Sequence, residues 1–183
     1  HSLELHPTNR NLIFAGTSDG ALHISYDGGK TWKRIATKLS STYISSIKFH
    51  PADSKIFYYG VSSARDSKTG RHFGSPGFDT GLYTTKDGGK TVKKISGLEI
   101  LTFRPEQEFV SKKTQLEVYD VLVHPAKPNI ILVGTASEGI FRSEDGGKTW
   151  QESTNGIPKE GFYWNVNFDG PDMDELERRC KEG

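Results

Sequence analysis

The chain alternates short apolar runs with clusters of Gly, Pro, Asp and Asn. In the runs Leu3-x-Leu5, Ile47-x-Phe49 and Val121-x-Val123, every second residue is apolar, which is the period of a β-strand with one buried face. Each run ends in His-Pro, and the histidines are His6, His50 and His124. No amphipathic helical pattern competes before the last dozen residues. The pattern predicts an all-β chain of short strands.

The strand pattern recurs along the chain. The spacing from His6 to His50 is 44 residues, and a fourth run, Val166-x-Phe168, precedes Asp169, which lies 45 residues after His124. The middle spacing, from His50 to His124, is 74 residues. A period of this size indicates a repeat architecture, provided that the longer middle spacing has an explanation.

Three similar octets explain it. They are Ser25–Trp32, Thr85–Val92 and Ser143–Trp150, and each contains Asp-Gly-Gly-Lys-Thr. The distance from the His-Pro histidine to the octet Asp is 21 residues in the first and third repeats but 37 in the second, an insertion of 16. The distance from the octet Asp to the next histidine is 23 and then 37, an insertion of about 14. Without both insertions the middle spacing becomes 44.

Each repeat divides into four short strands. In the third repeat we expect them at about 118–123, 130–135, 139–144 and 149–153. Four strands in about 40–45 residues are typical of a β-propeller blade. The sequence predicts a partial propeller with three blades, the inner strand of a fourth, and a tail with a short C-terminal helix. Their ranges are about 1–43, 44–117 and 118–161 for the blades, 162–168 for the inner strand and 169–183 for the tail.

The octet resembles the Asp-box, or bacterial neuraminidase repeat, of sialidases, sortilin-type receptors, tandem-propeller xyloglucanases and propeller-type photosystem II assembly factors. The resemblance covers residues 1 to about 168. It implies a propeller in which each box forms the turn between the third and fourth strands, and by itself it points to an extracytoplasmic location. It does not select a function, because these relatives do unrelated things.

The boxes are expected to be structural. Two glycines allow a tight turn, the Asp can accept its own turn's N–H groups, and the Trp offers a large apolar face. A calcium loop would need several alternating oxygen ligands, and a residue repeated in every blade indicates scaffold; the same holds for the three histidines, so we expect no metal and no cofactor. The structural box residues are Asp27, Gly28, Gly29, Thr31, Trp32, Asp87, Gly88, Gly89, Thr91, Asp145, Gly146, Gly147, Thr149 and Trp150.

The composition indicates which classes of binding partner to expect. A net charge of +1 across 183 residues favours neither nucleic acid nor an anionic membrane surface, and no apolar run approaches the ~20 residues of a membrane span. The single cysteine, Cys180, excludes an internal disulfide framework and leaves the compartment open. Because the chain begins with His1, we expect a mature chain, a truncated chain or part of a longer one.

Function is expected where the repeat is interrupted. The insertions, at about 61–80 and 96–116, are interpreted as the loop between strands 2 and 3 of blade two and the link to blade three. Both should emerge on the face opposite the boxes. Arginines among aromatic residues suit carboxylate, phosphate or sugar surfaces, although surface loops also tolerate insertions at little cost. The candidate ligand-binding residues are Arg65, Lys68, Arg71, His72, Phe73, Phe78, Asp79, Phe103, Arg104, Glu106 and Glu108.

Two functions remain open. The first, which we favour, is a non-enzymatic propeller module that binds a protein or glycan. The second is a fragment of an Asp-box glycoside hydrolase. A sialidase would carry Phe/Tyr-Arg-Ile-Pro before its first box, whereas Phe103-Arg104-Pro105 lacks the Ile and follows the second box. A xyloglucanase-type enzyme needs two facing carboxylates, which Asp79, Glu106 and Glu108 can supply.

Three blades and one strand do not close a ring, since propellers usually have about 4–8 blades. Repeat units cannot bury their faces alone. We therefore expect further blades from the same chain, a second copy or another subunit, or a cap formed by the tail, in which Asp172 can act as the helix N-cap.

Overall fold

Four-stranded antiparallel sheets form the blades. A computed structural model describes residues 2–35, 39, 42–65, 72–73, 80–102, 112–135 and 138–157. Blade one consists of β1 (Ser2–Leu5), β2 (Ile13–Gly16), β3 (Leu22–Ser25) and β4 (Lys33–Ile35). Blade two consists of β5 (Thr42–His50), β6 (Asp53–Arg65), β8 (Gly81–Thr85) and β9 (Lys93–Lys94), with β7 (His72–Phe73) paired to the end of β6. Blade three consists of β12 (Val118–Val123), β13 (Ile131–Thr135), β14 (Ile140–Ser143) and β15 (Gln151–Glu152).

The predicted all-β partial propeller is confirmed. No helix occurs in the part of the chain that the structure describes. The inner strand expected at 162–168 and the helix expected at 169–183 lie outside the described residues.

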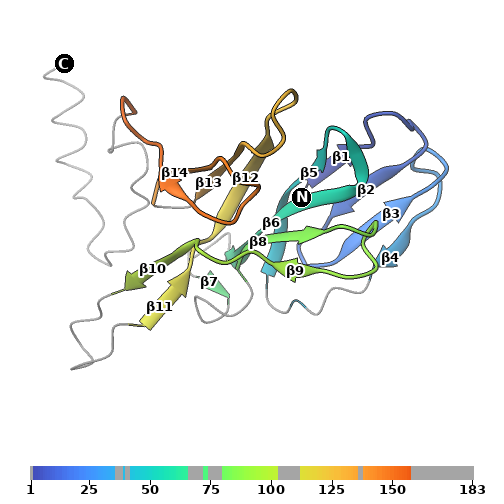
Figure 1. The fold of residues 1–183 in the computed structure, drawn as a ribbon. Coiled ribbons are helices and arrows are strands. Elements are labelled where there is room, and N and C mark those ends of the chain that lie inside the picture. The colour runs from blue at the N-terminus through green and yellow to red at the C-terminus, as the bar shows by residue number, and fades with distance from the viewer. Residues whose placement is uncertain are drawn as a thin grey trace, which may run out of the picture.

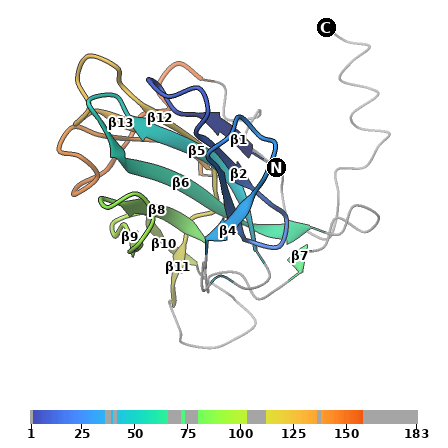
Figure 2. The same ribbon diagram turned by 90° about the vertical axis from the view of Figure 1, so that its right-hand side faces the viewer.

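The blades pack side by side with their inner strands adjacent. Strand β5 lies between β1 and β12 (Figure 2). Along β6, Phe57, Tyr59 and Val61 join the cluster shared with blade one, whereas Tyr58 joins the cluster shared with blade three. Blade two is therefore buried on both faces. Each fully buried Leu, Ile or Phe contributes about 1.5–3 kcal/mol, so the two interblade clusters supply most of the stabilisation.

Glycines allow the blades to approach closely. A Cβ on Gly16 would lie 2.5 Å from Cγ2 of Ile44, and a Cβ on Gly60 would lie 2.7 Å from Cγ1 of Val118. Ile44 and Val118 each lie near the start of the next blade's inner strand. Any larger residue at either glycine would force the two blades apart.

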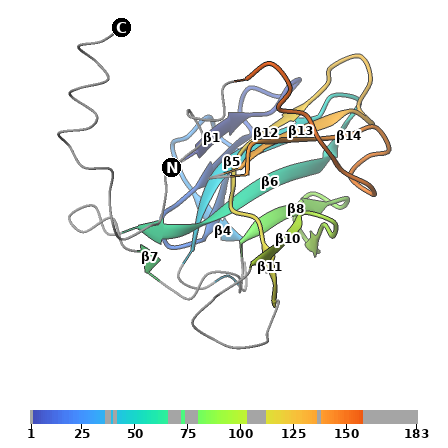
Figure 3. The ribbon, with the colours of Figure 1, turned by 90° about the vertical axis from the view of Figure 1, so that its left-hand side faces the viewer.

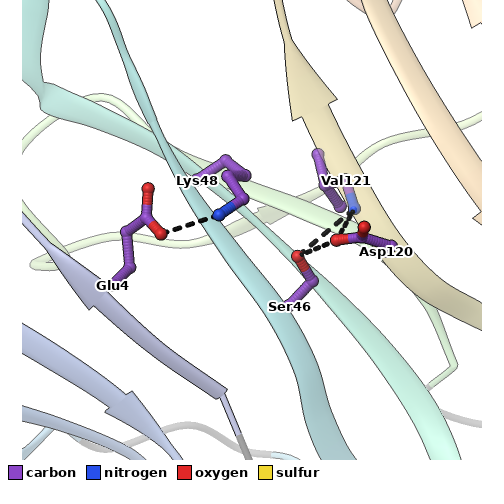
Figure 4. A network of polar contacts seen from close by, with 5 residues as sticks. All are labelled: Glu4, Ser46, Lys48, Asp120 and Val121. Atoms are coloured by element: carbon purple, nitrogen blue, oxygen red, sulfur yellow. Dashed lines mark hydrogen bonds and ion pairs between the residues drawn. The ribbon is translucent and has the colours of Figure 1, made fainter.

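Polar bridges join the three inner strands. Lys48 Nζ lies 2.7 Å from Glu4 Oε2, and the Ser46 hydroxyl donates to Asp120 Oδ1 at 2.7 Å (Figure 4). The Val121 amide donates back to Ser46 Oγ at 3.2 Å. A partly exposed ion pair adds no more than about 1 kcal/mol, so these bridges fix which residues face one another while apolar burial provides the stability.

Both insertions contain strands, which the sequence pattern does not predict. Strand β6 continues through Arg65 and pairs with β7, and the link between blades two and three contains a ribbon of β10 (Glu99–Thr102) and β11 (Lys112–Gln115). In the other blades a threonine stands where the second strand ends. The hydroxyls of Thr17, which follows β2, and of Thr135, the last residue of β13, donate to the carbonyls of Ala21 and Gly139. Blade two has Val61 at this position. Valine has no hydroxyl to close such a turn, and β6 continues to Arg65.

The box tryptophan packs against the preceding blade. Trp150 contacts the second interblade cluster, and Gly147 of its box lies over Ile95 of blade two. Gly89 of the second box likewise lies over Ile35 of blade one, but Val92 stands where the others have Trp and is 38% exposed.

Val92→Trp should therefore be neutral or stabilise the fold by up to about 1–2 kcal/mol, because the ring can cover Ile35. Trp150→Val is the matched reverse change and should lower the free energy of unfolding. Denaturant titration of both variants checks this. A clearly destabilised Val92→Trp variant would show that the space beside Ile35 is already filled.

Candidate functional site

Each Asp-box turn is closed by its own side chains. Asp145 Oδ1 accepts the Thr149 N–H at 2.9 Å, and Oδ2 accepts the Thr149 hydroxyl at 2.6 Å. Gly146 and Gly147 have φ angles of 75° and 88°, a left-handed conformation that favours glycine. Asp27 and Asp87 make the same bonds to Thr31 and Thr91. The box carboxylates thus hold the turn.

A buried hydroxyl at the first box position is a structural feature that the sequence reasoning missed. Ser143 Oγ accepts the Gly147 N–H at 2.8 Å and donates to Asp145 Oδ1 at 2.8 Å, and the side chain is 1% exposed. Ser25 and Thr85 are placed alike. The available signal was that all three octets begin with Ser or Thr.

The His-Pro histidines hold turns as well. His6 Nδ1 accepts the N–H groups of Thr8 at 3.2 Å and Asn9 at 3.0 Å, and His50 and His124 do the same for the residues two and three positions on. The box then bonds to this turn: the N–H groups of Gly28, Gly88 and Gly146 donate to the carbonyls of Asn11, Lys55 and Asn129, each at 2.9 Å. Within the described ranges, no cluster of three or more His, Cys, Asp or Glu side chains could hold a metal ion.

The strand register shows where the insertions leave blade two. Phe57 of β6 pairs with Thr85 at the end of the sheet that carries the box, and Val61 pairs with Gly81 at the other end. Strand β9 is antiparallel to β8 and runs toward that same other end. In Figures 1 and 3, β7 and the β10–β11 ribbon lie below β8, away from the β8–β9 turn. Both insertions therefore leave the sheet opposite the box.

The bases of the two insertions are hydrogen-bonded to each other. The Ser62 hydroxyl donates to Glu117 Oε2 at 2.8 Å, and the Ser63 hydroxyl donates to Glu117 Oε1 at 2.5 Å. Ser62 and Ser63 belong to the strand that enters the first insertion, and Glu117 directly follows the second. Both serines are buried. We call these three residues the insertion base.

Two tyrosines adjoin the insertion base. Tyr43 is the partner of Ser62 in the β5–β6 ladder. Burial raises the pKa of Tyr43 to about 12, against an opposing hydrogen bond with Ser62, and the neighbouring Tyr119 and Glu117 add to the rise. The Tyr43 phenol thus stays protonated at neutral pH. Phenols beside a carboxylate combine flat apolar faces with hydrogen-bonding groups, which suits a polar ligand such as a peptide or a sugar.

The structure does not describe the side chains of the ligand-binding residues predicted from the sequence. The backbone of Arg65 pairs with His72, and that of Phe73 pairs with Ala64; the positions of their side chains are not described. Eight further candidates lie outside the described residues, namely Lys68, Arg71, Phe78, Asp79, Phe103, Arg104, Glu106 and Glu108. Their role stays a prediction.

The family model for sortilin and neurotensin receptor 3, Sortilin-Vps10, matches residues 1–99, more than half of the chain. The chain belongs to the Sortilin-Vps10 family. The BNR/Asp-box repeat model also matches, at residues 141–152, which contain the whole of the third box. Together with the sheets, these matches show that this member of the Sortilin-Vps10 family is part of a BNR/Asp-box β-propeller.

Solved propeller structures share the fold. An ancestral GH74 enzyme is 22% identical with a TM-score of 0.59, and the match covers 82% of this chain and 18% of that one. The GH74 xyloglucanase from Xanthomonas campestris is 16% identical with a TM-score of 0.54, covering 86% and 23%. YCF48 bound to D1 peptide is 17% identical with a TM-score of 0.50, covering 82% and 39%. The chain thus spans less than two fifths of each of these proteins.

No curated protein matches the sequence. Over the described residues, the chain has no helix that is long and apolar enough to cross a membrane.

Ser143→Ala should lower the free energy of unfolding by about 1–3 kcal/mol, because it leaves buried N–H groups of the box turn without an acceptor. Ser18→Ala, in an exposed turn of blade one, is the matched control and should change stability little. Equal stability of the two variants in urea titrations would contradict the role assigned to the box hydroxyl.

Acid should weaken the box turns. Hydrogen bonds from the Thr31 hydroxyl, then the Thr31 N–H and then Ser25 lower the pKa of Asp27 from 3.8 to about 2. The pKa of Asp87 falls to about 2 for the same reasons, and that of Asp145 lies well below its usual range. These pKa values are lower in the folded state than in the unfolded state. The ionised carboxylates therefore stabilise the fold fully above about pH 4, and this stabilisation is lost as the pH falls toward 2.

Urea titrations across this pH range should show a steep loss of stability in the native chain. Asp145→Asn should be less stable at neutral pH but should lose less stability on acidification. An unchanged pH slope in this variant would contradict the assignment.

Proposed function

We propose that this chain is a non-enzymatic propeller module that binds a protein or glycan through the face opposite the Asp-boxes. The observation that carries the proposal is the insertion base: Ser62 and Ser63 hold Glu117, and so hold the bases of both insertions together. Two insertions whose bases are held together at one end of a sheet can form a continuous recognition surface, which two independent loops would not.

The distribution of polar groups supports this choice of face. On the box side, carboxylates and hydroxyls bond within their own turns. On the insertion side, Tyr43 and Tyr119 stand beside the insertion base. A structural neighbour of the same fold, YCF48, is bound to a D1 peptide, which supports a protein partner as one option.

The alternative is a fragment of an Asp-box glycoside hydrolase, sialidase- or xyloglucanase-like. The GH74 neighbours favour it at the level of fold alone. Hydrolysis requires a carboxylic acid and a second carboxylate placed across the sugar. Glu117 accepts two serine hydroxyls, one on each oxygen, which suits a fixed structural carboxylate better than a proton donor. The binding module is therefore preferred.

Replacing residues 62–79 with Ser18-Asp19-Gly20, the tip of the short blade-one turn, should preserve folding and abolish binding. The probes are a glycan microarray and a phage-displayed peptide library, each screened with the native chain first. Folding is expected to survive because the pairing of Gly60 with Leu82 and of Phe57 with Thr85 is kept.

The matched control is the double variant Ser62→Ala with Ser63→Ala, which keeps the insertion but removes both bonds to Glu117. It should weaken the binding of the same probes without abolishing it. If the loop-replacement variant still bound the probes, the binding site would lie outside the first insertion. Release of sugar from xyloglucan or a sialoside by the native chain would favour the hydrolase.

A further inference from the structure

Each box turn holds an exposed lysine at the same position. Lys30, Lys90 and Lys148 stand three residues after the box Asp, and all three are exposed. The neighbouring turn of each blade, which accepts the N–H of the first box glycine, holds one more exposed cation. These further cations are Arg10, Lys55 and Lys127. We call the six residues the basic face.

The alignment of the blades brings these cations to one side of the molecule. Glu4 and Lys48 each stand two residues before a His-Pro histidine, and they form an ion pair (Figure 4). Ser46 and Asp120 each stand four residues before one, and they are hydrogen-bonded. Because equivalent positions meet, the three inner strands lie side by side without a shift along their length. The box turns therefore lie at the same end of all three blades.

The cations of the basic face differ from other described cations in their pairing. Among the described residues, none of the six makes an ion pair. Four cations elsewhere on the sheets do have partners: the ion pairs are Arg34–Asp19, Lys48–Glu4 and Arg142–Glu144, and Lys94 lies over the ring of Tyr83. The net charge of +1 therefore conceals a group of unpaired positive charges at the box end.

The carboxylates at the box end are bonded within their own turns. Asp27, Asp87 and Asp145 each accept the N–H and the hydroxyl of the box Thr, and Asp53 Oδ1 accepts the Lys55 N–H at 3.0 Å. Because each box presents its Asp three residues before its Lys, a flat anionic membrane surface would meet both charges at once. A linear polymer can follow the cations instead.

We propose that the basic face binds a linear anionic polysaccharide, with the box lysines contacting its sulfate or carboxylate groups. The cations recur once per blade, which suits a polymer whose anionic groups also repeat. Five of the six are lysines, whereas nucleic-acid recognition favours arginine. Tyr26, directly before the first box Asp, is 68% exposed and offers a ring on which a sugar can stack. The inference does not depend on the proposed binding function, which concerns the opposite face.

The first test measures the binding of the full chain to heparin and to hyaluronate, which carries carboxylates but no sulfate. The triple variant Lys30→Gln, Lys90→Gln and Lys148→Gln should bind at least about tenfold more weakly, because three contacts that release counterions are lost. The control triple variant, with the same change in net charge, is Arg34→Gln, Lys48→Gln and Lys94→Gln. It should bind nearly as tightly as the native chain. Melting temperatures show that both variants are folded. Unchanged binding in the first variant, or an equal loss in both, would overturn the proposal.

The second test separates the classes of partner and the two faces. Binding to either polysaccharide should fall steeply as the salt concentration rises, because the contacts are exposed charges. The variant in which Ser18-Asp19-Gly20 replaces residues 62–79 should bind the polysaccharide as the native chain does, and a loss there would place the site on the opposite face. Tighter binding of the native chain to single-stranded DNA or to phosphatidylserine vesicles than to either polysaccharide would assign the face to that partner. Either result, or no binding to heparin and hyaluronate, overturns the proposal.

Discussion

The fold depends on the burial of one blade against the next. Each sheet has two apolar faces and can cover neither by itself, so stability resides in the interblade clusters around Phe14 and Phe57 on one side and Tyr58 and Leu82 on the other. The contact is close because Gly16 and Gly60 let the neighbouring inner strand approach their backbone. The box turns serve the same end, since Gly89 and Gly147 rest on Ile35 and Ile95 of the preceding blade.

The two ends of blade two differ in how their polar groups are used. One end of blade two is occupied by self-contained bonds, from the His50 turn to the box carboxylate of Asp87. The other end lacks the threonine that closes blades one and three, and there the chain extends its strand and carries extra residues. There the insertion base of Ser62, Ser63 and Glu117 joins two segments by hydrogen bonds, whereas in the other blades a short turn fixes the chain.

The sequence predicts the fold well because the information is local and repeated. Each box turn requires two left-handed glycines, a hydrogen-bond acceptor and a residue that begins the next strand. These requirements produce the same octet in each repeat, with Asp27, Asp87 and Asp145 as the acceptors. The insertion base could not be predicted in this way. Ser62 and Glu117 are 55 positions apart. Neither has a counterpart in the other repeats, so the repeat pattern does not indicate that they are in contact. The sequence does not predict that β6 continues to Arg65, because the polar residues Ser62 and Ser63 are typical of a loop. Their hydrogen bonds to Glu117 are visible only in the structure.

Among the described blades, the one that carries the insertions is the best supported. In a linear array, stability is approximately the sum of each unit's own term and its nearest-neighbour interfaces. Among the described blades, blade two has interfaces on both sides, whereas Leu3 and Leu5 of blade one are 71% and 49% exposed at the positions equivalent to Ile47 and Phe49. Local opening should therefore reach blade two last. The proposed recognition surface would lose affinity if its base had to become ordered on binding. The insertion base lies on the blade that two interfaces already hold in place.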